Sequence, residues 1–244
     1  MSMLFSDYDG TFANTIENIS INCDAVANYM RRGNVFVLSS GRSFESLFRK
    51  TIEHNIPYDY LACADGCYLF DKNGKLLLSH QVSHDSVSQV RELEDLAHFD
   101  RIDYTYERDY SVVYDSKENI ASISFVIKDK NVNSSFLKRF NELKMENPQY
   151  DYVVYGFEDT SYYMIKAKGI SKSAPIDYLK DKLMVPRKEI FTVGDGINDM
   201  EMIRDYNGFM IGSKKELYDV ALDKYDSVHE LVNDIMNKKV KRRW

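Results

Sequence analysis

Short apolar runs alternate with helical patterns at both ends of this 244-residue chain, and this alternation constrains its fold more than any other feature. Residues 3–5, 35–39 and 60–63 are apolar enough to form buried strands. Between them, residues 21–30 and 44–52 carry apolar side chains at helical spacing. Strands that alternate with helices predict βαβ units, and therefore a parallel sheet with helices on both faces.

The same alternation returns in the last third of the chain. Helices are predicted over residues 176–183 and 228–235, and strands over residues 190–193 and 209–211. Ser171 is the predicted N-cap of the first of these helices, because a serine hydroxyl can accept a hydrogen bond from a free backbone N–H. The two ends of the chain therefore predict one doubly wound, three-layer α/β domain.

The middle of the chain has a different composition. It has no glycine between Gly74 and Gly156, and nine of the 18 tyrosines lie within residues 101–170. The patterns predict a hairpin at 68–78, a helix at 87–96 capped by Asp85, strands at 111–114 and 120–128, a helix at 136–143, and strands at 151–156 and 161–167. We therefore predict an α+β module over residues 81–166, inserted into a core formed by residues 1–80 and 167–244.

Composition limits the classes of function. The net charge of −6 does not suggest a nucleic-acid binder, and the basic residues 238–243 are predicted to be a solvated helix end. Three cysteines cannot form a disulfide framework, which favours a reducing compartment such as the cytoplasm. The apolar runs are too short to span a bilayer, so no membrane partner is expected.

The first cluster of candidate catalytic residues is Phe-Ser-Asp-Tyr-Asp-Gly-Thr at residues 5–11. Asp7 and Asp9 follow a predicted strand, and residues two apart in a strand face the same side, so both carboxylates would face one pocket. Gly10 allows a sharp turn that exposes N–H groups to an anion. Aspartate and glycine are also ordinary turn formers, and this simpler explanation stays open for the cluster alone.

The second cluster is Thr-Val-Gly-Asp-Gly-Ile-Asn-Asp-Met at residues 192–200. It again places acids after a strand, at the sheet edge where open α/β sheets bind their ligands. Carboxylates from two separate loops suit Mg²⁺, which prefers hard oxygen ligands. An Asx-rich turn before a helix would also explain this segment.

Two further features are weaker. In Val-Leu-Ser-Ser-Gly-Arg at residues 37–42, a hydroxyl beside a glycine at a helix start can donate to a phosphate, although a helix N-cap explains it equally well. Lys172 is predicted early in a helix, where the macrodipole disfavours a cation. A fixed anionic partner would explain its place, and a solvated surface lysine is the ordinary alternative.

Taken in order, Asp-x-Asp-Gly-Thr, Ser-Gly-Arg, Lys and Gly-Asp-Gly-x-Asn-Asp resemble the haloacid dehalogenase-like (HAD) hydrolase superfamily. The chain looks most like the Cof-type subfamily, in which an α/β cap is inserted between the second and third motifs. The resemblance covers residues 3–80 and 167–244, and the predicted cap matches by position and pattern only.

The resemblance implies a role for each matching residue. Asp7 would be the nucleophile that takes the phosphoryl group, and Asp9 the general acid and then the base. The phosphate would be bound by Gly10, Ser40, Gly41, Lys172 and Asn198. Mg²⁺ would be held by Asp7, the carbonyl of Asp9, Asp195 and Asp199. Phosphoryl transfer needs mainly positioning and countercharge, which this set would supply.

Two positions depart from the family pattern. Ser40 stands where threonine is commoner, and Asp65 stands where asparagine is usual. Asp65 would either cap the turn into the hairpin or accept hydrogen bonds from substrate hydroxyls. Arg42 would either contact the substrate or pair with an acid.

The resemblance implies a Mg²⁺-dependent phosphatase of small phosphorylated metabolites such as sugar phosphates, with a mobile cap that selects the leaving group. A phosphomutase of the same superfamily is one alternative, and a non-catalytic metabolite-binding descendant is another. The second is disfavoured because the acids and the lysine of the motifs are all present. A receiver-like signalling module is disfavoured because its acidic pair precedes the phosphorylated aspartate.

Overall fold

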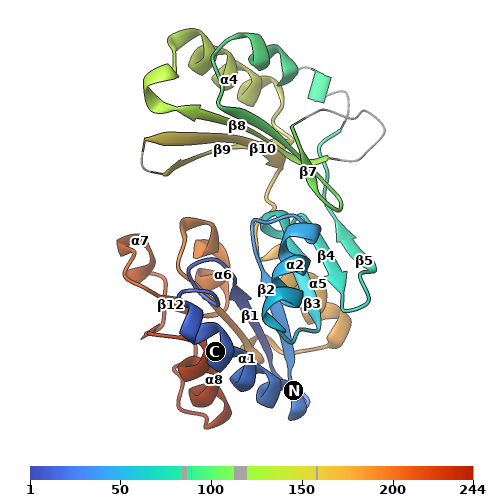
Figure 1. The fold of residues 1–244 in the computed structure, drawn as a ribbon, viewed down its shortest axis with the longest axis vertical. Helices are drawn as coiled ribbons and strands as arrows, with labels where there is room; N and C mark the ends of the chain where they lie inside the picture. Colours follow the sequence, from blue (N-terminus) through green and yellow to red (C-terminus); the bar gives the residue numbers. More distant parts are fainter. Residues whose placement is uncertain (84–86, 89, 113–119, 158, 244) are drawn as a thin grey trace. The chain divides into compact units, whose positions relative to one another are not determined.

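The computed structural model describes residues 1–83, 87–88, 90–112, 120–157 and 159–243 (Figure 1). The chain divides into two compact units, one formed by residues 1–78 with 171–244 and the other by residues 79–170. The predicted helix cap at Asp85 and the last two residues of the predicted strand 111–114 lie outside the described residues.

The first unit contains an eight-stranded sheet. In sheet order its strands are β13 (Lys224–Tyr225), β12 (Asn207–Ile211), β11 (Ile190–Gly194), β1 (Met3–Asp7), β2 (Val35–Ser39), β3 (Tyr60–Cys63), β4 (Tyr68–Asp71) and β5 (Leu76–Ser79). The strands from β13 to β3 are parallel, and β4 pairs with β3 in the antiparallel sense. The predicted parallel sheet is confirmed, and β13 is an edge strand that the sequence patterns did not predict.

Helices cover both faces of this sheet. On one face lie α5 (Ala174–Leu183), α6 (Met200–Asp205) and α7 (Lys215–Tyr218); on the other lie α1 (Ile16–Arg31), α2 (Phe44–His54) and α8 (Val228–Met236). Phe5 of β1 packs in one cluster with Ile176 of α5, and the rings of Phe44 in α2 and Phe70 in β4 lie 4.3 Å apart on the opposite face. The predicted three-layer α/β core is therefore confirmed.

The strand order places β1 at the centre of the parallel part of the sheet. From β1 the chain continues to β2 on one side, and it returns later to β11 on the other side. Ligands of open α/β sheets bind at the carboxyl ends of the strands where the order reverses in this way. All residues of β1 and β11 are buried, because helices cover both faces of the sheet.

The second unit contains a five-stranded sheet. In sheet order its strands are β7 (Tyr110–Ser111), β6 (Arg101–Tyr106), β8 (Ile120–Lys128), β10 (Thr160–Ala167) and β9 (Tyr150–Phe157). Its described pairings are antiparallel. The helix α4 (Ser134–Glu146) and the 3₁₀ turn η2 (Arg91–Asp95) pack on one face, so the predicted α+β character is confirmed, whereas β6 was not predicted.

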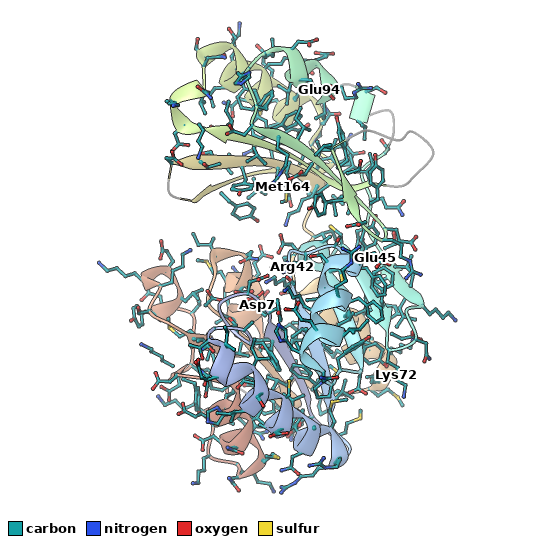
Figure 2. The ribbon with its side chains drawn as sticks, in the orientation of Figure 1. Asp7, Arg42, Glu45, Lys72, Glu94 and Met164 are labelled. Atoms are coloured by element: carbon teal, nitrogen blue, oxygen red, sulfur yellow. The ribbon has the colours of Figure 1, made fainter. Side chains whose placement is uncertain are left out.

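Four tyrosines of the second unit lie in its core. Tyr104, Tyr106, Tyr152 and Tyr163 are each at most 7% exposed. The ring of Tyr163 meets that of Phe136 in α4 edge to face at 4.9 Å. The structure therefore supports sheet formation and core packing as the role of these four rings. In Figure 2, Glu94 marks the helical face of this sheet and Met164 the face without helices.

The start of α5 differs from the prediction. The helix begins at Ala174, and Ser173 precedes it without a side-chain capping bond. The Oγ of Ser171 instead accepts a hydrogen bond from the N–H of Ser173, 3.3 Å away, in the turn before the helix. Lys172 therefore lies in the turn before the helix and not within it.

The basic C-terminal segment agrees only in part with the prediction of a solvated helix end, because Lys238, Lys239, Lys241 and Arg242 are exposed but lie beyond the helix. The last helix, α8, ends at Met236, and the tail after it packs against the first unit. The Nζ of Lys241 lies 2.9 Å from a carboxylate oxygen of Asp223. The guanidinium of Arg243 donates to the backbone carbonyls of Ile203, Tyr206 and Val220. Among the described residues, no helix has the length and apolar character needed to cross a membrane.

Candidate active site

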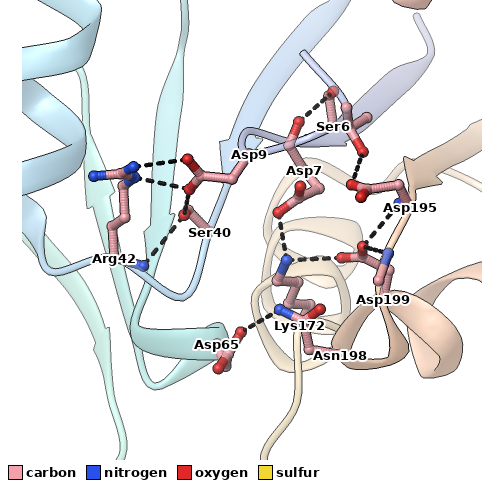
Figure 3. Close-up of polar contacts among 12 residues, drawn as sticks. Ser6, Asp7, Asp9, Ser40, Arg42, Asp65, Lys172, Asp195, Asn198 and Asp199 are labelled. Atoms are coloured by element: carbon pink, nitrogen blue, oxygen red, sulfur yellow. Dashed lines mark hydrogen bonds and ion pairs between the residues drawn. The ribbon is translucent and has the colours of Figure 1, made fainter. Parts of the chain in front are cut away.

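The centre of the candidate site is a buried lysine between two aspartates (Figure 3). The Nζ of Lys172 donates to Oδ1 of Asp7 at 2.6 Å and to Oδ1 of Asp199 at 2.7 Å. Lys172 is fully buried, and Asp7 and Asp199 are 5% and 1% exposed. Asp7 ends β1, whereas Asp199 belongs to the 3₁₀ turn η5 (Ile197–Asp199) that follows β11. The fold therefore joins three segments that are far apart in the sequence.

A third aspartate completes an acidic group beside this lysine. Oxygens of Asp7, Asp195 and Asp199 all lie within 4.8 Å of one another. The hydroxyl of Thr11 donates to Oδ1 of Asp195 at 2.6 Å. The second carboxylate oxygen of Asp199 accepts the N–H groups of Asp195 and Gly196, at 3.0 and 2.8 Å. These bonds fix Asp195 and Asp199, the two acids of the segment 192–200, toward Asp7.

The charges of this group do not balance. Burial raises the pKa of Asp7 well above its usual range, and the carboxylates of Asp199 and Asp195 raise it further, against the lowering effect of Lys172. Burial alone would lower the pKa of Lys172, but Asp199 and Asp7 outweigh it and raise this pKa. Burial also raises the pKa of Asp195. Three carboxylates against one ammonium leave an excess of negative charge that a divalent cation would neutralise.

Gly10 is required because the turn after β1 lies very close to Asp195. Its φ is +79°, in the left-handed region that side chains disfavour. A Cβ atom there would lie 2.4 Å from Oδ2 of Asp195, closer than atoms can approach. The glycine thus allows the turn after β1 to pack directly against an acid of the candidate metal site.

Asp9 has a different environment from Asp7. Its two carboxylate oxygens accept hydrogen bonds from Nε and Nη2 of Arg42, each at 2.7 Å. Its side chain is 53% exposed. Figure 3 shows the carboxylate of Asp9 directed toward Arg42 and that of Asp7 directed toward Lys172. The expectation that both carboxylates face one pocket does not hold here, because β1 ends at Asp7 and the alternation of a strand does not extend to Asp9.

Ser40 lies beside Asp9 at the end of β2. It is 1% exposed, and its Oγ accepts the backbone N–H of Arg42 at 3.2 Å and lies 3.5 Å from a carboxylate oxygen of Asp9. The guanidinium of Arg42 also donates to Oγ of Ser46 at 3.1 Å. Of the two roles predicted for Arg42, the structure shows the pairing with an acid, Asp9.

Asp65 lies in a strained loop after β3. Ala64 and Asp65 have φ of 51° and 49°, which is unusual for residues with a side chain, and Gly66 has φ of 93°. The loop is held to the second motif segment by N–H groups of Asp65 and Ala64 that donate to the carbonyls of Ser40 and Arg42. A carboxylate oxygen of Asp65 accepts the amide of Asn198 at 3.0 Å. The structure thus joins Asp65 to another candidate residue, whereas its contact with a substrate stays a prediction.

All predicted site residues belong to the first unit and gather at the carboxyl ends of its central strands. Asp7, Lys172, Asp195 and Asp199 form one hydrogen-bonded centre, while Asp9, Ser40 and Arg42 form a second set. Thr11, Tyr8 and Ser46 contact site residues but received no predicted role. Thr11, which bonds Asp195, could have been found as the last residue of its motif; Tyr8, whose ring lies 5.6 Å from the Arg42 guanidinium carbon, gave no such signal.

Comparison with known families agrees with this geometry. The model of the haloacid dehalogenase-like hydrolase family matches residues 4–148 and 109–224 of the chain. A search of the curated proteins found no match.

Solved structures resemble the whole chain. A phosphatase of the haloalkanoate (HAD) enzyme superfamily from Bacteroides thetaiotaomicron is 18% identical, with a TM-score of 0.77 over 97% of this chain and 94% of that one. A HAD subclass IIB sugar phosphatase is 16% identical, with a TM-score of 0.73 over 98% and 99%. A haloacid dehalogenase-like hydrolase from B. subtilis is 15% identical, with a TM-score of 0.76 over 97% and 99%. At these identities the likeness concerns the fold.

Proposed function

The chain belongs to the haloacid dehalogenase-like hydrolases, and from this premise we propose that it is a Mg²⁺-dependent phosphatase that acts through an aspartyl phosphate on Asp7. The observation that carries the proposal is the contact of the Asp7 carboxylate with the buried ammonium of Lys172. A carboxylate can approach an anionic phosphate only where cations offset the repulsion, and this contact supplies one.

The proposed reaction has two steps. An oxygen of Asp7 attacks phosphorus, the bond between phosphorus and the ester oxygen breaks, and Asp9 gives its proton to the leaving alcohol. In the second step Asp9 takes a proton from water, the water oxygen attacks phosphorus, and the bond to Asp7 breaks, which releases inorganic phosphate. The buried ammonium of Lys172, which bonds Asp7 directly, offsets the charge of Asp7 in both steps.

The residues of the acidic group fit a magnesium ion. Asp7, Asp195 and Asp199 offer hard oxygen donors and an excess of negative charge, and we propose that they hold Mg²⁺ together with the carbonyl of Asp9. When bound, the metal would shield the charge of the phosphoryl group. We further propose that the phosphoryl oxygens are bound by Gly10, Ser40, Gly41, Lys172 and Asn198.

Residues 81–166 are proposed to serve as a cap domain that selects the leaving group. A structural relative is a sugar phosphatase, so small sugar phosphates are the substrates that we propose first. The three cysteines are free thiols, which supports the proposal of a reducing compartment, the cytoplasm.

The test is release of inorganic phosphate from a panel of sugar phosphates and other small phosphate monoesters, with Mg²⁺ and with a chelator. We expect Mg²⁺-dependent release by the wild type and none by Asp7→Asn, which keeps the shape of the nucleophile but not its charge. Trapping of the phosphorylated enzyme would then locate the phosphoryl group. Activity of Asp7→Asn equal to the wild type, or product that is a rearranged phosphate ester without phosphate release, would contradict the proposal.

A further inference from the structure

The ion pair of Asp9 with Arg42 occupies both oxygens of a carboxylate. Nε and Nη2 of Arg42 each donate at 2.7 Å, in the parallel fork geometry that guanidinium groups form with carboxylates and phosphates alike. The side chains are 53% and 35% exposed, so solvent reaches the pair from one side. Both oxygens of the Asp9 carboxylate therefore act as acceptors of guanidinium hydrogen bonds.

The donors around Asp9 form a set suited to an anion. Arg42 is fixed by Ser46, to which its Nη1 donates at 3.1 Å, and by the ring of Tyr8, which lies 5.6 Å from the guanidinium carbon. The buried Ser40 hydroxyl lies 3.5 Å from the same Asp9 oxygen that Arg42 Nε reaches. The Arg42 guanidinium and the Ser40 hydroxyl thus donate toward the same position, which an oxygen of the Asp9 carboxylate occupies.

We propose that Asp9 is an internal stand-in for the anion of the substrate: its carboxylate closes the site made by Arg42 and Ser40, and an incoming phosphate displaces it. The exchange makes Arg42 a positioning residue that holds Asp9 away from Asp7 until an anion takes its place. The link to acid catalysis rests on the proposed function, whereas the exchange of one anion for another does not.

Competition between the two anions has a direct consequence for affinity. A ligand that must displace an internal anion binds more weakly than it would to the free donors. Removal of the Asp9 charge should therefore strengthen binding of inorganic phosphate. The gain should require the guanidinium, because without Arg42 there are no shared donors to set free.

The test measures binding of inorganic phosphate to the full chain by isothermal titration calorimetry. We expect Asp9→Asn to bind roughly three- to tenfold more tightly than the wild type, since a half-exposed bidentate pair is lost. The matched control is Glu45→Gln, which removes an acidic side chain from the first turn of α2 without touching the fork and should change the affinity by about twofold or less. In the Arg42→Gln background, Asp9→Asn should give no gain.

A spectroscopic measurement reports the exchange itself. In ¹⁵N-labelled wild type, the Nε–H resonance of Arg42, assigned by its loss in Arg42→Gln, should shift on addition of phosphate and also in phosphate-free Asp9→Asn. Three results would overturn the exchange: an equal gain in phosphate affinity for Asp9→Asn and Glu45→Gln, a gain that persists without Arg42, or an Arg42 resonance that does not shift on addition of phosphate. Exchange in a protein that hydrolyses no ester would count against the proposed function alone.

Discussion

The Nζ of Lys172 lies 2.6 Å from Oδ1 of Asp7, although 165 residues separate them in the sequence. The lysine is fully buried, so the pair is isolated from solvent. A buried charge is tolerated only when it is paired, and Lys172 bonds a second carboxylate, that of Asp199. The same contact therefore serves the stability of the core and the proposed chemistry.

Replacement of Lys172 should lower both the stability of the fold and the rate of the proposed reaction. We expect Lys172→Met to lower kcat by roughly 10²- to 10³-fold, since a fixed cation at the reacting group is lost. Loss of one partner of a buried pair should also lower the free energy of unfolding by about 3–5 kcal/mol. The control is Lys180→Met on α5, because Lys180 pairs with Asp177 on the exposed side of the helix. Phosphate-release kinetics and urea unfolding check both, and wild-type kinetics in Lys172→Met would contradict the proposed role.

Magnesium should stabilise the folded chain, because it would bind carboxylates that are brought together only by folding. At a hundredfold excess over its Kd, we expect about 2.7 kcal/mol, or roughly 5–10 °C in Tm. Asp195→Asn should reduce this shift, because it removes one of the three clustered carboxylates. Thermal unfolding with and without Mg²⁺ measures it, and an equal shift in the wild type and in Asp195→Asn would place the bound ion elsewhere.

A comparison of Gly10 with Gly33 can test the contact between position 10 and Asp195, because the two glycines have nearly the same backbone conformation. Gly10 and Gly33 have φ of +79° and +80°, so an alanine is equally strained at either position. Only at position 10 would its Cβ meet Asp195, whereas nothing lies within 4 Å at position 33. We expect both variants to lose about 1–2 kcal/mol of stability, and only Gly10→Ala to lose Mg²⁺ affinity in addition. Equal Mg²⁺ affinity of the two variants, measured by calorimetry, would show that this contact does not shape the metal site.

The sequence patterns predicted the central strands because those strands are buried on both faces and are therefore continuously apolar. They missed β13, whose two residues carry no pattern. They placed the start of α1 too late, at residue 21, whereas the helix begins at Ile16 and already buries Ile19. Thr15, whose side chain accepts the N–H of Asn18, is its N-cap.

The candidate site could also be predicted only in part from the sequence. Acids at strand ends could be predicted, because parallel strands bring their carboxyl ends to one edge of the sheet. The acid that pairs with Arg42 could not, since Asp9 and Arg42 are joined by side-chain directions after the strands end. The pairing of Asp65 with Asn198 likewise depends on a left-handed backbone at Asp65, which a residue with a side chain rarely adopts.

The C-terminal tail is held to the first unit by Arg243. Arg243 donates to the carbonyls of Ile203 and Tyr206, at the end of α6, and of Val220. Ile203 and Tyr206 lie at the end of α6, where backbone carbonyls need partners from outside the helix, and a cation at a helix C-terminus also suits the macrodipole. We therefore expect Arg243→Ala to lower the free energy of unfolding by about 1–3 kcal/mol.

The matched control for this effect is Lys239→Ala, which removes a positive charge from an exposed position of the same segment. It should change stability by about 0.5 kcal/mol or less. Arg243→Lys should recover only part of the loss, because an ammonium is a point charge and cannot present the fork that reaches several carbonyls at once. Urea unfolding of the three variants measures these differences. Equal stability of Arg243→Ala and Lys239→Ala would mean that the bonds of Arg243 to the end of α6 do not stabilise the fold.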